Sequence, residues 1–154
     1  VEDRNAVATQ PGGAVGQGGT QGSAVDPRAV AGVQGVQIGA DGQPVGVGRI
    51  VYFDYDSFVV KPEFQSVLEA NARVLNANRQ RRVQLEGHTD ERGGREYNLA
   101  LGQKRAEAVR RALGLLGVAD SQVEAVSFGK EKPAVAGGDE AAWAKNRRAE
   151  IVYR

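Results

Sequence analysis

Residues 82–116, RVQLEGHTDERGGREYNLALGQKRAEAVRRALGLL, carry the pattern that decides the fold. Over residues 82–88 apolar or small side chains alternate with polar ones, a period of two that predicts a half-buried strand. A polar loop follows at residues 89–94. Beyond it apolar residues recur at spacings of three and four, and Gly117 stands where a left-handed helix cap is expected. The stretch therefore predicts a strand, a loop and a helix with an inward face formed by Ala106, Val109, Leu113 and Leu116.

The flanking sequence adds three strands and two helices. Upstream, RIVYFDYDS has the β-branched and aromatic content of a strand, and Pro62 then stands in a first helical turn, where proline is tolerated. Helices between strands favour an α/β (α+β) sandwich, with helices on one or both faces of a mixed sheet. The added strands are residues 49–57, 123–128 and 149–154, and the added helices are residues 62–79 and 139–146.

The N-terminal third differs in composition from the rest. Residues 1–48 hold 12 of the 21 glycines, no aromatic residue and no lysine. Such a segment cannot bury enough apolar surface to offset the entropy of ordering it, so it predicts a disordered, flexible linker. The alternative is a weak hairpin or strand in GVQGVQIG at residues 32–39. Residues 49–154, with all nine aromatic side chains, are the predicted folded domain.

Composition excludes several functional classes. Twenty basic and nineteen acidic side chains leave a net charge of +1, without the basic excess typical of nucleic-acid binding. The absence of cysteine rules out a disulfide, a thiolate nucleophile and a cysteine-based zinc site within these 154 residues. With a single histidine as well, the sequence predicts neither a metal site nor a cofactor.

Asp90 and Arg105 are the principal candidates for binding. Asp90 follows a predicted strand, where α/β proteins often place ligands, but it could equally close a turn beside solvated Glu91 and Arg92. Arg105 lies beside the apolar stripe of its helix and needs an acceptor. The two charges form a salt bridge, or they are held apart to bind the ammonium and the carboxylate of a zwitterion.

Enzymatic interpretations are weaker. His88, Asp90 and Glu91 could suggest metal or acid–base chemistry, but neighbouring positions at a strand end point to different sides. Asp54 and Asp56 resemble a glycosidase pair, yet residues two apart lie closer than such mechanisms require. We therefore predict a protein that is not an enzyme.

Residues 87–113 together with SFGKEKP (127–133) and DEAAWAKNRRAEIVY (139–153) closely resemble the peptidoglycan-associated lipoprotein (Pal) branch of the OmpA-like family. They resemble OmpA-type and flagellar MotB-type cell-wall anchors more distantly. With VYFDYDS the resemblance covers residues 50–154, and Gly102, where many OmpA-type relatives have serine, favours the Pal branch. It implies an OmpA-like βαβαβ-type domain that binds the meso-diaminopimelate side chain of peptidoglycan without covalent chemistry.

The resemblance also implies site residues. It assigns the ligand ammonium to Asp90 and the α-carboxylate to Arg105. Leu101 would pack against the aliphatic arm of the ligand, or serve as core. Residues at the predicted helix end would frame the rim, or satisfy terminal carbonyls without a ligand. The further implied positions are Phe53, Asp54 and Asp56, which could also simply end a strand, and Asn98, Asn146, Arg147 and Arg148 at the rim.

Finally, the resemblance implies a location and partners. We expect a domain at the periplasmic face of the Gram-negative outer membrane, held by an N-terminal lipid on a cysteine that this chain lacks. The family tethers the outer membrane to the cell wall and works with TolB and other Tol components. The alternative is a module whose main partner is TolB, with wall binding secondary. In either case the wall and TolB are expected to compete.

Overall fold

The computed structural model describes residues 37–154. Residues 1–36 of the predicted linker therefore lie outside the described residues. Residues 37–48, which composition placed in the linker, belong instead to the compact unit Gln37–Arg154. In this segment the buried Gln43 accepts a hydrogen bond from the Tyr153 backbone N–H at 2.7 Å and donates to the Tyr153 carbonyl at 3.1 Å. The domain thus begins earlier than predicted. The hydrophobicity pattern does not indicate this, because the contact is made by the side chain of one polar residue, Gln43.

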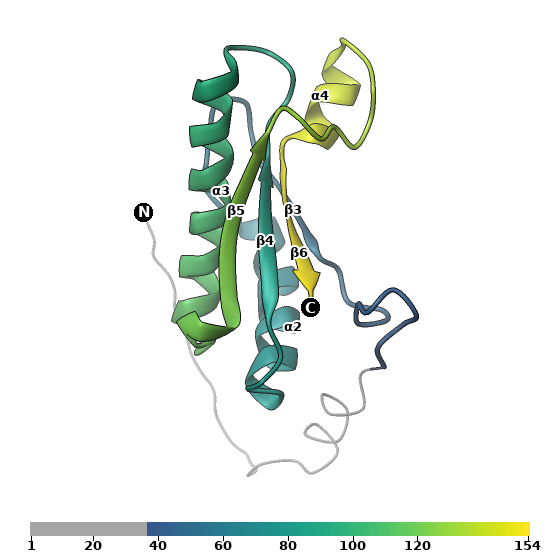
Figure 1. The fold of residues 1–154 in the computed structure, drawn as a ribbon, viewed down its shortest axis with the longest axis vertical. Coiled ribbons are helices and arrows are strands. Elements are labelled where there is room, and N and C mark those ends of the chain that lie inside the picture. The colour runs from purple at the N-terminus through teal and green to yellow at the C-terminus, as the bar shows by residue number, and fades with distance from the viewer. Residues whose placement is uncertain (1–36) are drawn as a thin grey trace. The chain divides into compact units, whose positions relative to one another are not determined.

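A four-stranded mixed sheet forms one layer of the domain (Figure 1). The strand order is β3-β6-β4-β5, with β4 and β5 parallel and the other neighbours antiparallel. The mixed sheet predicted from the sequence is confirmed. The strands are β3 (Ile50–Tyr52), β4 (Val83–His88), β5 (Val123–Gly129) and β6 (Arg148–Tyr153).

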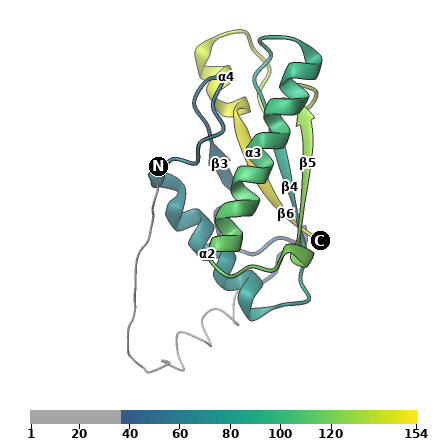
Figure 2. The same ribbon diagram turned by 90° about the vertical axis from the view of Figure 1, so that its left-hand side faces the viewer.

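Two long helices cover one face of this sheet (Figure 2). They are α2 (Gln65–Ala77), preceded by a 3-10 turn at Pro62–Phe64, and α3 (Arg95–Leu115). Helix α3 connects the parallel strands β4 and β5, as a parallel pair requires. The short helix α4 (Glu140–Asn146) lies at the end of the sheet where β4 ends (Figure 1). Among residues 37–154, no helix combines the length and apolar character needed to cross a membrane.

Packing between α3 and β4 is unusually close at two glycines. A Cβ on Gly102 would overlap the Ser127 hydroxyl and lie 2.9 Å from the Gly87 carbonyl oxygen. A Cβ on Gly87 would collide with the Gly102 carbonyl. The helix therefore rests directly on the strand, which brings its N-terminal half against the loop at residues 89–94. The core around this contact includes the fully buried Leu68, Leu75, Leu85, Leu113 and Ile151.

The first strand is shorter than predicted. The β-branched and aromatic pattern predicted a strand over 49–57, but β3 ends at Tyr52. A turn follows, in which the Ser57 N–H donates to the Asp54 carbonyl at 3.2 Å and Asp56 has a positive φ of 53°. This turn carries Tyr55 and Asp56 to the end of β4, where the polar loop begins.

Candidate functional site

A pocket opens where three segments meet: the turn after β3, the loop between β4 and α3, and the first half of α3. It holds about 50 Å³ of free space. Whole small-molecule sites enclose about 300–1,000 Å³, so this pocket fits the end of one side chain. Its lining residues are Tyr55, Asp56, Thr89, Asp90, Arg92, Gly93, Tyr97, Asn98, Leu101 and Arg105.

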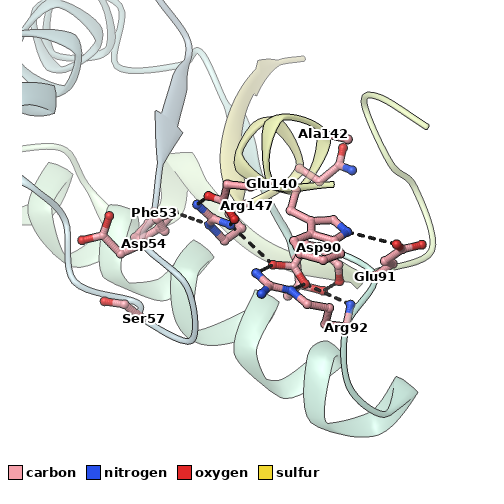
Figure 3. A network of polar contacts seen from close by, with 12 residues as sticks. Phe53, Asp54, Ser57, Asp90, Glu91, Arg92, Glu140, Ala142 and Arg147 are labelled. Atoms are coloured by element: carbon pink, nitrogen blue, oxygen red, sulfur yellow. Dashed lines mark hydrogen bonds and ion pairs between the residues drawn. The ribbon is translucent and has the colours of Figure 1, made fainter. Parts of the chain in front are cut away.

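Asp90 is a buried carboxylate surrounded by arginines, with an exposed fraction of 4% (Figure 3). Its Oδ2 lies 2.8 Å from Arg92 Nη2, and its Oδ1 accepts from the Arg92 backbone N–H at 2.9 Å and from Nε at 3.3 Å. Arg147 Nη1 lies 3.6 Å from Oδ2. Burial alone would raise the pKa of Asp90, but the hydrogen bonds and charge of Arg92 outweigh it and hold the pKa below its usual value. Asp90 is therefore ionised at neutral pH.

Arg105 is fully buried and bonded to backbone carbonyls. Burial lowers its pKa to about 10, while the charge of Asp90 acts in the opposite direction. The side chain therefore stays cationic at neutral pH. Among residues 37–154 the structure contains no direct ion pair between Asp90 and Arg105, so of the two alternatives the salt bridge is not formed. Arg105 donates to the carbonyls of Ser57 at 2.8 Å, His88 at 2.9 Å and Asp54 at 3.1 Å.

The three candidates after β3 play different parts. Phe53 is buried outside the pocket lining, and its carbonyl accepts from Arg147 Nε at 3.0 Å. The Asp54 carboxylate pairs with Lys61 at 3.0 Å and is largely exposed, so Asp54 contributes only its carbonyl to Arg105. Asp56 lines the pocket and accepts a hydrogen bond from the Tyr97 hydroxyl. Of this group, only Asp56 presents a carboxylate to the pocket.

Leu101 and Asn98 both line the pocket. Leu101 is 8% exposed and so serves the core as well. Asn98 Nδ2 donates to the Arg92 carbonyl at 2.8 Å, which helps to fix the loop.

The two arginines after α4, Arg147 and Arg148, differ in their contacts. Arg147 reaches the back of Asp90 and pairs with Glu140 at 2.9 Å (Figure 3). Arg148 lies outside the pocket lining, pairs with Glu150 at 2.5 Å, and donates to the Asn146 carbonyl at the end of α4 at 3.3 Å. For Arg148 the alternative interpretation, a cation satisfying helix-end carbonyls, is the better description. Asn146 itself holds the preceding loop by accepting from the Ala134 N–H at 2.7 Å.

Arg92 was not among the site residues predicted from the sequence, where it was mentioned only as a solvated residue in the alternative turn. Its guanidinium carbon lies 4.0 Å from the ring centroids of both Tyr55 and Trp143. Trp143 Nε1 in turn donates to Glu91 Oε2 at 3.0 Å. These partners come from three separate segments, and no spacing along the chain signals their convergence.

The pocket contains both a negative and a positive side chain, Asp90 and Arg105. A carboxylate and a guanidinium line one small cavity without pairing with each other: Asp90 is bonded to Arg92, and Arg105 to backbone carbonyls. Arg105 has five N–H donors and uses three on carbonyls, which leaves two for an incoming carboxylate. Within residues 37–154 no group of three or more His, Cys, Asp or Glu residues is placed to hold a metal ion.

Comparisons with known proteins are consistent with this geometry. A sequence profile of the OmpA family matches residues 52–147. The peptidoglycan-associated lipoprotein of Pseudomonas putida is 48% identical over 139 residues, which covers 88% of this chain and 83% of that protein. The protein of the same name from Pseudomonas aeruginosa is 56% identical over 100 residues, covering 65% of this chain and 59% of that one.

Solved structures agree in fold. The crystal structure of the peptidoglycan-associated lipoprotein from Burkholderia pseudomallei superposes with a TM-score of 0.69 at 61% identity, over 70% of this chain and 91% of that chain. The C-terminal domain of Helicobacter pylori MotB superposes with a TM-score of 0.64 at 21% identity, over 71% and 85% of the two chains, and shares the fold alone.

Proposed function

The chain belongs to the OmpA family, with relatives named peptidoglycan-associated lipoprotein, and from this premise we propose that it binds peptidoglycan non-covalently and tethers the outer membrane to the cell wall. The family resemblance seen in the sequence is thereby confirmed. The proposal places the domain at the periplasmic face of the outer membrane, anchored by an N-terminal lipid on a cysteine outside these 154 residues. In this proposal the protein links the outer membrane to the cell wall mechanically and does not catalyse a reaction.

The observation that carries the proposed site is the pairing of Asp90 and Arg105 across one small pocket. The side-chain end of meso-diaminopimelate carries an ammonium and a carboxylate on the same carbon. In the proposed complex, Asp90 accepts hydrogen bonds from the ammonium, and the two unused N–H groups of Arg105 donate to the carboxylate. Leu101 packs against the methylene arm. Lysine, which lacks that carboxylate, would leave Arg105 without a ligand partner.

Cosedimentation with purified peptidoglycan sacculi tests the proposed function. The wild-type domain should sediment with sacculi, and Asp90→Asn, which keeps the shape but removes the charge, should remain mostly in solution. Arg111→Gln, a charge change on an exposed residue of α3, is the control and should behave as wild type. Equal sedimentation of all three proteins would refute the assigned site. Release of soluble muropeptides during the incubation would refute a purely binding role.

A second partner surface surrounds the same pocket. Tyr55 and Tyr97 line the pocket yet are 60% and 59% exposed, and Phe58 and Val59 nearby are 43% and 66% exposed. Exposed aromatic side chains of this kind are typical of protein interfaces. We propose that TolB binds here and competes with the wall. Titrating a diaminopimelate-containing peptide into a preformed complex with TolB should release TolB, and a ternary complex would exclude competition.

A further inference from the structure

Arg92 occupies the carboxylate that the proposed function assigns to the ligand (Figure 3). Its Nη2 lies 2.8 Å from Asp90 Oδ2 and its Nε lies 3.3 Å from Oδ1, so the guanidinium spans both oxygens. The backbone N–H of Arg92 adds a third hydrogen bond at 2.9 Å. A ligand ammonium and the Arg92 guanidinium therefore need the same acceptor atoms.

An aromatic clamp holds Arg92 in this position. The rings of Tyr55 and Trp143 each stand 4.0 Å from its guanidinium carbon, a distance at which cation–π attraction is effective. Trp143 is itself fixed by its hydrogen bond to Glu91. The clamp links the turn after β3 to helix α4 through one cation, so releasing Arg92 alters the surroundings of Trp143.

Arg92 is the most displaceable of the three arginines around the pocket. Its side chain is 31% exposed, whereas that of Arg147 is 9% exposed. Arg147 is also tied to Glu140 and to the Phe53 carbonyl, and the fully buried Arg105 is tied to three backbone carbonyls. A cation arriving at Asp90 therefore displaces Arg92 before it displaces either of the others.

The outcome of displacing Arg92 from Asp90 depends on whether the ligand carries a carboxylate. The Arg92 side chain is 31% exposed, so when a ligand displaces it, its ion pair with Asp90 is exchanged for water or for another carboxylate. A ligand that carries a carboxylate beside its ammonium supplies one at the pocket mouth. A bare ammonium supplies none and adds a positive charge to a site that already contains three arginines. The contacts of Arg92 therefore favour zwitterionic side chains over simple amines.

We propose that Arg92 is a gate for ligand selection, which covers Asp90 in the empty pocket and is released by a ligand that brings a carboxylate together with its ammonium. The proposal rests on the proposed function, since it takes Asp90 as the ammonium site. It adds a specificity-determining residue to that site. It also predicts that the pocket rejects amine side chains actively, through a competing internal cation.

Two measurements on the whole chain test the gate. Trp143 is the only tryptophan, so its fluorescence reports on the clamp without a label. A diaminopimelate-containing stem peptide should change the emission of the wild-type protein, and the emission of ligand-free Arg92→Gln should already differ from that of wild type. Calorimetry should show that Arg92→Gln binds the lysine-containing stem peptide about tenfold more tightly than wild type, a change of about 1.4 kcal/mol. The preference for diaminopimelate should shrink accordingly.

Arg111→Gln on α3 is the matched control, and its emission and peptide affinities should equal those of wild type. Thermal melting of each variant verifies that it is folded. The gate is refuted if wild type binds the diaminopimelate peptide with no change in Trp143 emission. The gate is also refuted if Arg92→Gln prefers the diaminopimelate peptide over the lysine peptide as strongly as wild type does. Neither of these two results would contradict the proposed function. Failure of every variant to bind either peptide would overturn the proposed function and the gate together.

Discussion

Arg105 has a structural role in addition to its proposed role in binding. Its guanidinium is fully buried and holds three carbonyls, two of them in the turn after β3. Asp90 differs, because its hydrogen bonds go to Arg92, which has other partners in the aromatic clamp. A substitution at Asp90 therefore tests binding, whereas one at Arg105 changes binding and folding together.

The first prediction is that Arg105→Ala lowers the free energy of unfolding by roughly 3 kcal/mol or more, since three buried carbonyls lose their donor. Arg105→Lys should also destabilise, because an ammonium cannot reach three separated acceptors in the same geometry. Urea denaturation followed by circular dichroism measures both. Asp90→Asn should lose less stability than Arg105→Ala, because Arg92 and Arg147 keep other partners. An Arg105→Ala variant as stable as wild type would contradict the structural role.

The second prediction concerns His88, which the alternating pattern placed among the polar positions of β4. The structure buries it at 1% exposure, stacked on Phe128 at 5.5 Å between ring centroids, and among residues 37–154 neither ring nitrogen has a hydrogen-bond partner. Burial, reinforced by the charge of Arg148, lowers the pKa of His88 from 6.5 to about 4. The unfolded chain therefore binds this proton more tightly than the folded domain.

Above about pH 6.5 His88 is neutral in both the folded and the unfolded protein and should not affect the free energy of unfolding. As the pH falls from 6.5 toward 4, the unfolded chain takes up a proton that the folded domain does not, so the free energy of unfolding should fall. The loss from this group is on the order of 3 kcal/mol at pH 4. Urea denaturation at pH 7 and pH 4 measures it. His88→Phe keeps the stacking on Phe128 and should remove this share of the acid sensitivity. An identical pH dependence in the two proteins would show that His88 is not the group responsible.

At the scale of elements, the four strands and three α-helices of residues 37–154 were predicted in the correct order, because the strands and the α-helices differ in periodicity. Gly117 has the left-handed φ of 97° expected of a helix cap, and the Asp139 side chain accepts from the Ala142 N–H at the start of α4. The length of β3 was wrong. Its aromatic pattern continues to Tyr55, but Tyr55 and Asp56 line the pocket instead of extending the sheet.

The third prediction is that Gly102→Ala destabilises the domain, since the new methyl group would meet Ser127 and the Gly87 carbonyl. Overpacking of this kind typically costs about 1–3 kcal/mol. Gly114→Ala in the same helix is the control: nothing lies within 4 Å of the added Cβ, and alanine should stabilise the helix by about 0.5–1 kcal/mol. Thermal melting should give a lower melting temperature than wild type for Gly102→Ala and a higher one for Gly114→Ala. A shared direction would contradict the close contact between α3 and β4.

At the scale of the whole molecule, composition predicted the presence of a folded domain and misplaced its start. The insertion of Gln43 beside Tyr153 depends on a contact between two residues 110 positions apart. Composition averages over such contacts. The same limit applies to the pocket, where charge pattern and resemblance identified Asp90 and Arg105 but no local signal identified Arg92, Tyr55 or Tyr97.

The fourth prediction is that Gln43→Ala lowers the free energy of unfolding by about 1–3 kcal/mol, because it leaves the Tyr153 N–H and carbonyl without their partner. Gln37→Ala, at an exposed position of the same segment, should have no measurable effect. Urea denaturation of the two variants measures the difference. Equal stabilities would place the start of the domain at residue 49, as composition predicted.

The most direct test of the central claim is isothermal titration of the protein with a diaminopimelate-containing stem peptide and with its lysine counterpart. We predict selective binding of the diaminopimelate peptide, weakened in Asp90→Asn by roughly 1.5–3 kcal/mol for a lost charge-assisted hydrogen bond. Arg111→Gln should bind as wild type does. Equal affinity for the two peptides, or no binding of either, would contradict recognition of a zwitterionic side chain by Asp90 and Arg105.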